Sequence, residues 1–297
     1  MARTFLKSSW DALPLCMGFL SLGTLLLSAG PRLIHEWTVN PNAEHVMLTL
    51  PVGALVLASR LGELRRGARD GPFLTAALPL LALGLCCLFL DAALGEPFLL
   101  ACGLWCGGLG TTALFCGRKG LRAALFPFVL LAFAIPAPQA LARNLLHLHL
   151  QRAAAAVTGG VLALGGLTAH TTGTLVNVGG KALTVAEQCS GLKFLTTLSF
   201  GALVTGWMLL PGRLFAKVLL AASALPVAFA VNVMRLCIAA VVLQSSGTKA
   251  MNIFLHEGWA VMLLYALGIA MLVGLAILLR GIGTSQVVTI LHGKQRP

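Results

Sequence analysis

The chain has few charged residues and one tyrosine, and it lacks the signatures of nucleotide-binding and zinc-dependent proteins. Charged residues make up 10% of the 297 positions and hydrophobic residues 58%. A soluble domain of this length needs a more polar surface, so most of the chain is expected to face lipid. No phosphate loop or dinucleotide fingerprint is present, and the pair His256 and Glu257 lacks the second histidine of a metalloprotease helix. We therefore expect neither a cofactor nor a metal ion.

The long apolar runs predict an all-α bundle of about eight transmembrane helices, forming a single integral-membrane domain over residues 1–297. A helix needs about 20 apolar residues to cross the hydrocarbon core, and these runs are too long and continuous for barrel strands. Residues 142–188 are expected to lie outside the membrane, with an interfacial helix and a small hairpin that turns at Gly179 and Gly180. The predicted spans cover residues 14–30, 46–60, 73–91, 97–116, 123–141, 190–210, 218–243 and 257–280.

The lysines and arginines predict that both termini are cytoplasmic. The formal net charge is +12, but the basic residues form short clusters between apolar runs and no stripe interleaved with aromatic residues. This distribution is typical of membrane topology signals, and nucleic-acid binding is not expected. With the N-terminus inside, the short outer loops hold only Arg32 and Lys249 among the basic residues. The hairpin segment, 142–188, is then extracytoplasmic.

One stretch gathers reactive side chains in an otherwise apolar chain: VAEQCSGLKF, residues 185–194. Seven of the eight cysteines lie inside apolar runs and behave there as small hydrophobic residues, whereas Cys189 lies at the predicted outer end of the sixth span. A helix N-terminus offers unpaired N–H groups and a partial positive charge, and both favour a thiolate. A lone interfacial cysteine is more often structural, so a catalytic role for Cys189 depends on which residues the neighbouring helices bring to the same side of the membrane.

Two further residues are predicted on the same side of the membrane. Arg235 interrupts the seventh span, where a charge costs about 2.5–3.5 kcal/mol on insertion scales and marks a functional site. Counted from residue 218 it lies about 25 Å along the helix, in the outer leaflet. His256 opens the eighth span. Each residue alone has a structural explanation, but together they supply a nucleophile in Cys189, a base in His256 and a charge for the oxyanion in Arg235.

At these residues the chain resembles the exosortase/archaeosortase family of integral-membrane transpeptidases. The resemblance rests on VAEQCSGLKF, NVMR and FLHEG, in that order, and it is best over residues 120–260, the expected catalytic core. It implies Cys189 as the nucleophile, His256 as the acid/base, and Arg235 as the partner of the oxyanion or of a substrate carboxyl.

The same resemblance implies an enzyme of the bacterial inner membrane whose active site faces the extracytoplasmic side. Its substrates would be secreted proteins with a C-terminal sorting signal, made of a short motif (often Pro-Glu-Pro), a transmembrane helix and a basic tail. The acyl-enzyme would pass the protein to a surface acceptor. The motif, the acceptor and the balance between hydrolysis and transfer are not encoded in any pattern of this sequence.

Two other function classes are compatible with the same residues. A transporter could use Arg235 and His256 as a substrate-ion pair, although buried charges near the midplane and repeated halves would then be expected. The sequence has no convincing internal repeat. A non-catalytic membrane scaffold for envelope or polysaccharide assembly is the other alternative.

Overall fold

The computed structural model describes residues 23, 29–40, 43, 45–136, 148–185, 191–256 and 258–293. For residues 255, 256, 258 and 282–293 it describes the backbone alone. The chain packs as two compact units, residues 1–138 and 139–297. The single domain over 1–297 and the catalytic core over 120–260 stay predictions.

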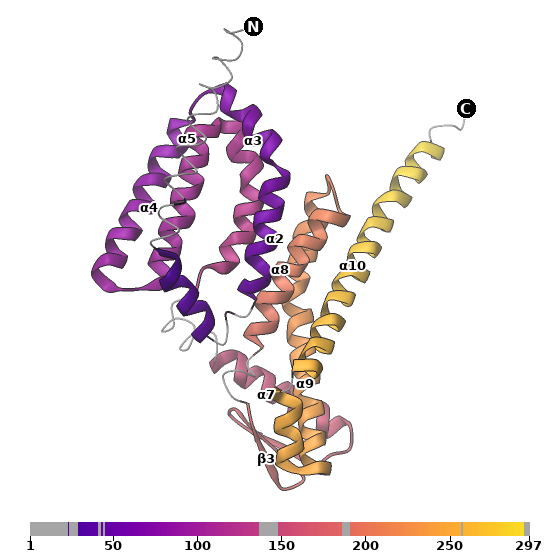
Figure 1. Cartoon of the computed structure of the whole chain (residues 1–297). Helices are drawn as coiled ribbons and strands as arrows, with labels where there is room; N and C mark the ends of the chain where they lie inside the picture. Colours follow the sequence, from indigo (N-terminus) through magenta and orange to yellow (C-terminus); the bar gives the residue numbers. More distant parts are fainter. Residues whose placement is uncertain are drawn as a thin grey trace, which may run out of the picture. The chain divides into compact units, whose positions relative to one another are not determined.

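All regular secondary structure in the described residues of the first unit is helical, and Figure 1 shows its elements. Residues 29–39 form a helix, and η1 and η2 are short 3₁₀ turns. The axes of α2 and α3 differ by 53°, so the chain bends sharply where they join. The elements are α2 (Val46–Ser59), α3 (Leu61–Gly67), η1 (Ala68–Asp70), α4 (Leu74–Leu94), α5 (Pro97–Leu131) and η2 (Ala132–Ala134).

The helix α5 contains a reversal of the chain at Gly117. This residue has φ 62° and ψ −166°, which is not helical. The indole Nε1 of Trp105 donates to the carbonyl oxygen of Phe128 at 2.7 Å. In a straight helix these residues would be about 34 Å apart at 1.5 Å per residue. The two halves of α5 therefore run antiparallel over the described residues. This is the arrangement expected for two consecutive spans, 97–116 and 123–141.

At the other end of this unit, side chains tie the helices together. The guanidinium of Arg32 donates to both carboxylate oxygens of Asp91, at 2.7 and 2.9 Å. The hydrogen bond to Asp91 raises the pKa of Arg32. The side chains of Trp37 and His45 hydrogen-bond to η2, through the carbonyl oxygens of Ala134 and Phe133. Polar contacts of this kind fit the outer loops predicted from the charge pattern.

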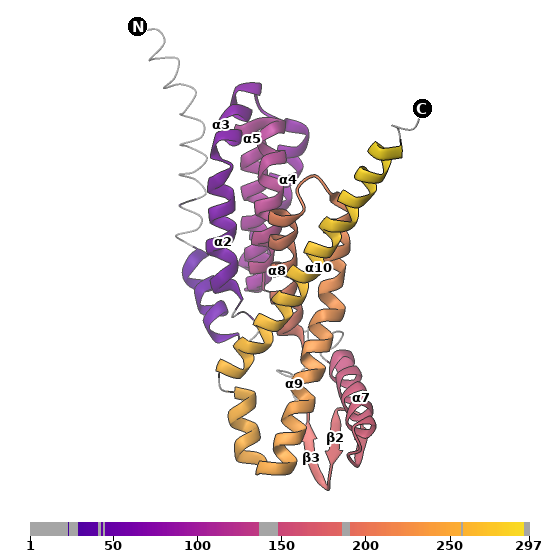
Figure 2. The ribbon, with the colours of Figure 1, turned by 90° about the vertical axis from the view of Figure 1, so that its right-hand side faces the viewer.

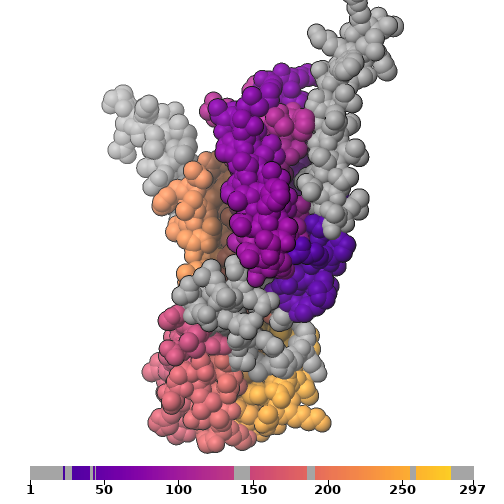
Figure 3. Space-filling view, turned by 90° about the vertical axis from the view of Figure 1, so that its left-hand side faces the viewer, coloured from indigo at the N-terminus to yellow at the C-terminus, as the bar shows by residue number. Residues whose placement is uncertain are grey.

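Apolar side chains cover the outside of α4. Only 17% of its most apolar 18 residues are buried inside the protein. The surface of α4 forms much of the face of the first unit seen in Figure 3. Leu78, Leu83 and Phe89 are among its exposed side chains. In water such a surface would be costly, so it fits a lipid-facing helix.

The second unit holds three long helices and a small sheet. Figure 2 shows α8, α9 and α10 running alongside one another. Phe194 and Leu198 of α8, Ala228 of α9, and Leu264 and Leu272 of α10 share one buried cluster. The elements are α7 (Leu148–Leu164), β1 (Ala169–Thr172), β2 (Leu175–Val178), β3 (Lys181–Thr184), α8 (Leu192–Leu209), α9 (Leu214–His256) and α10 (Gly258–Gly293).

The sheet confirms the predicted hairpin and adds a strand to it. Strands β2 and β3 pair antiparallel, with Val178 opposite Lys181 across Gly179 and Gly180. Both glycines have positive φ, 56° and 79°, as a two-residue hairpin turn requires. The added strand, β1, pairs antiparallel with β2 in the order β1-β2-β3. Helix α7 precedes the hairpin, where a helix was expected, and its position at the membrane interface stays a prediction.

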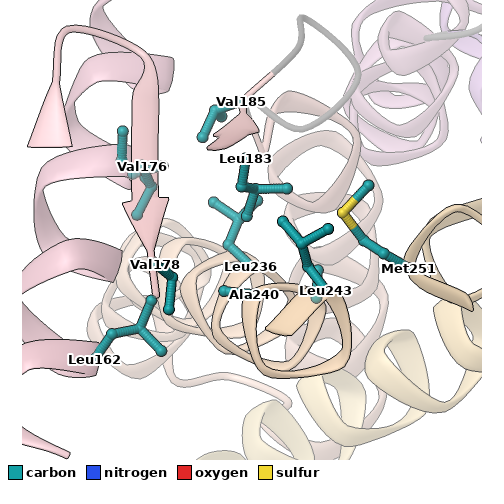
Figure 4. Packing of buried hydrophobic residues seen from close by; sticks show 12 residues of the cluster. Leu162, Val176, Val178, Leu183, Val185, Leu236, Ala240, Leu243 and Met251 are labelled. Carbon is teal, nitrogen blue, oxygen red and sulfur yellow. The ribbon is translucent and has the colours of Figure 1, made fainter. Parts of the chain in front are cut away.

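One face of the sheet packs on helices. Val176 and Leu183 are cross-strand neighbours, 0% and 2% exposed, and their side chains meet Leu162 of α7 and Leu236 of α9 in a second cluster (Figure 4). Period-two alternation in β2 places every second residue on this face. The hairpin is therefore attached to α9, the helix that carries Arg235.

Five described helices are long and apolar enough to cross a membrane, or six if the bent pair α2 and α3 counts as one span. The fold is thus mostly helical, with fewer candidate spans than the eight predicted. One reason is that residues 97–134 count as one helix, although the chain reverses inside it. Another is that the predicted span 14–30 lies almost entirely outside the described residues. The cytoplasmic position of both termini stays a prediction.

Candidate active site

The cysteine motif leads into the first turn of α8. Cys189 itself lies outside the described residues, which resume at Gly191. Helix α8 begins at Leu192, and Gly191 is its N-terminal cap residue, with φ 87°. The sequence placed Cys189 at or just before the first turn of this helix. Helix α8 starts three residues after Cys189, and the position of the thiol stays a prediction.

Gly191 contacts α9 at the residue one turn before Arg235. A Cβ atom added to Gly191 would lie 3.1 Å from both Cγ and Nδ2 of Asn232. Asn232 is completely buried. A side chain here would require the buried Asn232 to move aside and would strain the positive φ, so glycine is favoured at this position. The end of the cysteine motif therefore packs directly against the face of α9 that carries the arginine.

Arg235 lies among three helices. It is only 7% exposed, and its Cζ lies 5.9 Å from the ring centroid of Phe194 in the first turn of α8. The Phe194 ring contacts the ring of Tyr265 on α10, with centroids 4.7 Å apart. A guanidinium over an aromatic face is attracted by the ring's quadrupole. Phe194 and Tyr265 thus fix one side of the arginine.

The chemistry available to Arg235 follows from its burial. A guanidinium keeps its charge in proteins and donates up to five hydrogen bonds in a rigid fork. In a site of low dielectric such a charge stabilises a developing oxyanion, or pairs with a carboxylate, far better than it would in water. Asn232 precedes it by three residues, on the same helix face. This face offers both a cation and an amide to a group placed near Gly191.

The third predicted residue, His256, ends α9, and its position depends on a second chain reversal. Gly247 inside α9 has φ 84° and ψ −179°. Met251 packs in the same cluster as Leu236, Leu243 and Val185. In an unbroken helix Met251 would continue about 12 Å beyond Leu243, away from Leu236. The segment 248–256 therefore folds back along α9, as Figure 2 shows.

This reversal brings the backbone of His256 toward the level of Arg235. Arg235 precedes Gly247 by 12 residues, or about 18 Å of helix, and the returning segment 248–256 rises about 13 Å. The two residues then differ by about one helical turn in height, whereas an unbroken helix would separate them by about 31 Å. The structure describes no side-chain contact of His256.

Some residues of this site were not identified from the sequence. Phe194 and Tyr265 look like ordinary core residues of apolar helices, and only their contacts connect them with Arg235. The sequence offered one weak signal for this role, because Phe194 follows Cys189 by only five residues. The six cysteines in the described part of the chain, all within α4, α5 and α9, are free thiols.

The comparisons agree with the resemblance of the three motifs. A family model described as transmembrane exosortase matches residues 37–280. No curated protein and no solved structure matches the chain. The matched range contains the cysteine motif, Arg235 and His256 and covers most of the chain. The chain therefore belongs to the transmembrane exosortase family of integral-membrane cysteine transpeptidases, which process proteins with PEP-CTERM sorting signals.

Proposed function

We propose that this protein cleaves C-terminal sorting signals of secreted proteins through an acyl-enzyme at Cys189 and transfers the protein to a surface acceptor. Family membership favours this activity over the transporter and scaffold hypotheses. The observation that carries the assignment of residues is the contact between Gly191 and Asn232, one turn from the buried Arg235. Cys189 precedes Gly191 by two residues in the sequence, and two residues of chain span at most about 7 Å.

In the first half of the proposed reaction, the thiol of Cys189 passes its proton to His256, and the thiolate attacks the scissile carbonyl carbon. Arg235 stabilises the oxyanion of the tetrahedral intermediate. When the C–N bond breaks, His256 gives the proton to the leaving amine, and the membrane anchor of the sorting signal departs. The secreted protein is left as a thioester.

In the second half, an acceptor nucleophile attacks the thioester carbonyl while His256 removes its proton. The C–S bond breaks, and the proton returns to Cys189. No redox partner is needed, because every step is an acyl or proton transfer. Water in place of the acceptor would give hydrolysis, so the two outcomes differ only in the nucleophile.

An extracytoplasmic position of the site is supported by the charges of the second unit. Arg213, just before α9, donates to the carbonyl oxygens of Leu279 and Arg280 on α10, so these basic residues lie together. Gly191 lies at the opposite end of α8, whose 18 residues span about 27 Å. Under the positive-inside rule the basic end is cytoplasmic and the end with the cysteine motif faces outward.

The test uses the purified full chain in liposomes, with a secreted reporter that carries Pro-Glu-Pro, a transmembrane helix and a basic tail. Cys189→Ala should abolish processing and leave the protein folded. Cys237→Ala, in the middle of α9, is the matched control and should process normally. Mass spectrometry should find the reporter attached to Cys189 by a thioester that hydroxylamine releases. Unchanged processing by Cys189→Ala would disprove the proposal.

A substitution series at Arg235 separates its charge from its geometry. Arg235→Met should lower kcat about 100- to 1000-fold, the usual cost of removing an oxyanion donor. Arg235→Lys keeps the charge but loses the planar fork, so an intermediate rate is expected. Equal activity of the lysine variant and the wild type would show that only the charge matters.

A further inference from the structure

The tip of the β2–β3 hairpin packs against α9 where the first part of that helix ends. The ammonium Nζ of Lys181 donates to the carbonyl oxygen of Leu243 at 3.0 Å and to that of Gln244 at 3.1 Å. A Cβ atom on Gly179, in the turn beside it, would lie 2.9 Å from Nε2 of Gln244. The turn residue Gly179 and the first residue of β3, Lys181, therefore both lie close to this helix end.

These carbonyl groups belong to the last turn before the reversal at Gly247. The helix dipole makes this end negative, and a lysine near it can hydrogen-bond to the last carbonyl groups. Lys181 places its positive charge at this end and bonds to two of these groups. Lys181 comes from a strand 62 residues earlier in the chain, so it also fixes where that strand lies along the helix.

The strand β3 connects this helix end with the cysteine motif. The hairpin tip and Lys181 are at its start, and Val185 directly after its end has its N–H bonded to the carbonyl oxygen of Thr174 at 2.9 Å. Val185 is the first residue of the motif VAEQCSGLKF. Val185 and Met251 lie in one buried cluster (Figure 4). One short strand thus touches both the segment that leads to Cys189 and the segment that leads to His256.

We propose that Lys181 is a positioning residue for the reaction. By capping α9 at Leu243 and Gln244 it holds the reversal at Gly247, and thereby sets the position of the returning segment, 248–256, relative to β3 and the cysteine motif. This proposal rests on the proposed function, because it matters for catalysis only if Cys189 and His256 react together. Lys181 touches neither the substrate nor the reacting atoms in this scheme.

The experiment compares Lys181→Met, Lys181→Arg and Lys249→Met in the liposome assay. Lys249 lies two residues past Gly247 and is exposed, as Lys181 is, so its replacement removes the same charge from the same region without removing the cap. We expect Lys181→Met to lower kcat about 10- to 100-fold, because displacements of about 1 Å far from the chemistry have effects of this size. KM should stay within about twofold, since no substrate contact is lost.

Rescue distinguishes the cap from a general effect on folding. An arginine at position 181 can donate to the same two carbonyl groups, so Lys181→Arg should recover most of the lost kcat. Amide hydrogen exchange over residues 244–256 should speed up in Lys181→Met and stay slow in Lys181→Arg. If Lys181→Met does not accumulate, Lys181→Gln provides the same comparison, because its amide keeps part of the cap.

The outcomes separate this proposal from the proposed function. If Cys189→Ala processes the reporter, the function itself is wrong. If Cys189→Ala is inactive but Lys181→Met keeps the wild-type kcat, the positioning role is wrong. An equal loss in Lys249→Met, or a loss that appears in KM, would also overturn it. A loss confined to kcat in Lys181→Met, reversed by arginine, supports the cap.

Discussion

Within its described residues the chain reverses direction inside a helix at Gly117 in the first unit and at Gly247 in the second, and the two reversals are stabilised differently. At Gly117 backbone packs on backbone: an added Cβ would collide with the carbonyl oxygen of Gly71, and Gly67 likewise lies against Gly120. At Gly247 an added Cβ would have no atom within 4 Å. The contacts that stabilise this reversal come from side chains: Lys181 bonds to the helix end, and Met251 of the returning segment packs on Leu243 in a buried cluster.

This difference shows what each reversal can do. A reversal filled by backbone atoms has one arrangement and serves to connect two antiparallel segments. Where the glycine itself meets no neighbouring atoms, side-chain contacts on either side of it set the geometry, so a distant strand can help to set the direction of the chain that follows. Only the second reversal leads to a proposed catalytic residue, His256. The comparison therefore predicts different consequences for equivalent substitutions.

The largest effect is expected for Gly117→Ala. A side chain at positive φ costs about 1–3 kcal/mol, and the collision with the Gly71 carbonyl oxygen adds about 1–3 kcal/mol of overpacking. We expect loss of several degrees in thermal midpoint and much less folded protein in detergent, measured by fluorescence-detected size-exclusion chromatography. Normal yield and midpoint would show that the backbone contact at Gly117 is loose.

Gly191→Ala should have the next largest effect, on activity more than on stability. The added Cβ presses on the buried Asn232 at 3.1 Å and strains the positive φ at the start of α8. Cys189, two residues earlier, would shift with this turn, so kcat should fall about 100-fold. The measurement is single-turnover thioester formation. Gly201→Ala in the same helix, whose added Cβ would make only an ordinary contact at 3.9 Å to Ile269, is the control.

The sequence was informative where one residue type is itself unusual. Arg235 stands out because a charge in an apolar helix is costly, and the Gly179 and Gly180 turn stands out because two glycines separate β-branched runs. The reversals at Gly117 and Gly247 do not stand out, because they are two of 33 glycines. Their conformations follow from tertiary contacts that no local pattern encodes.

The remaining differences have the same origin. Strand β1, residues Ala169–Thr172, was not predicted because three of its four side chains are exposed and it has no apolar alternation. The role of Lys181 depends on carbonyl groups of α9, far along the chain. Phe194 and Tyr265 became part of the site only through their contact geometry. A single sequence gives the residues with unusual chemistry but not the residues that place them.

Gly247→Ala tests the second reversal directly and should be milder than Gly117→Ala. The conformation at Gly247 is almost exclusive to glycine, so an alanine costs about 1–3 kcal/mol of strain, but no collision is added. We expect folded protein near the wild-type yield and a lower kcat, because the direction of 248–256 changes. Comparing yield and kcat between the two alanine variants checks this. A normal kcat for Gly247→Ala would separate the reversal from catalysis.

The smallest effect is expected for Lys119→Met, the counterpart of Lys181→Met at the first reversal. Lys119 pairs with Asp70 at 3.0 Å, but the two side chains are 72% and 40% exposed. An exposed ion pair of this kind contributes at most about 1 kcal/mol. The backbone contacts around Gly117 remain, so both thermal midpoint and kcat should match the wild type in the assays above. A loss as large as that of Lys181→Met would mean that the first reversal also depends on a lysine, and the distinction between the two would fail.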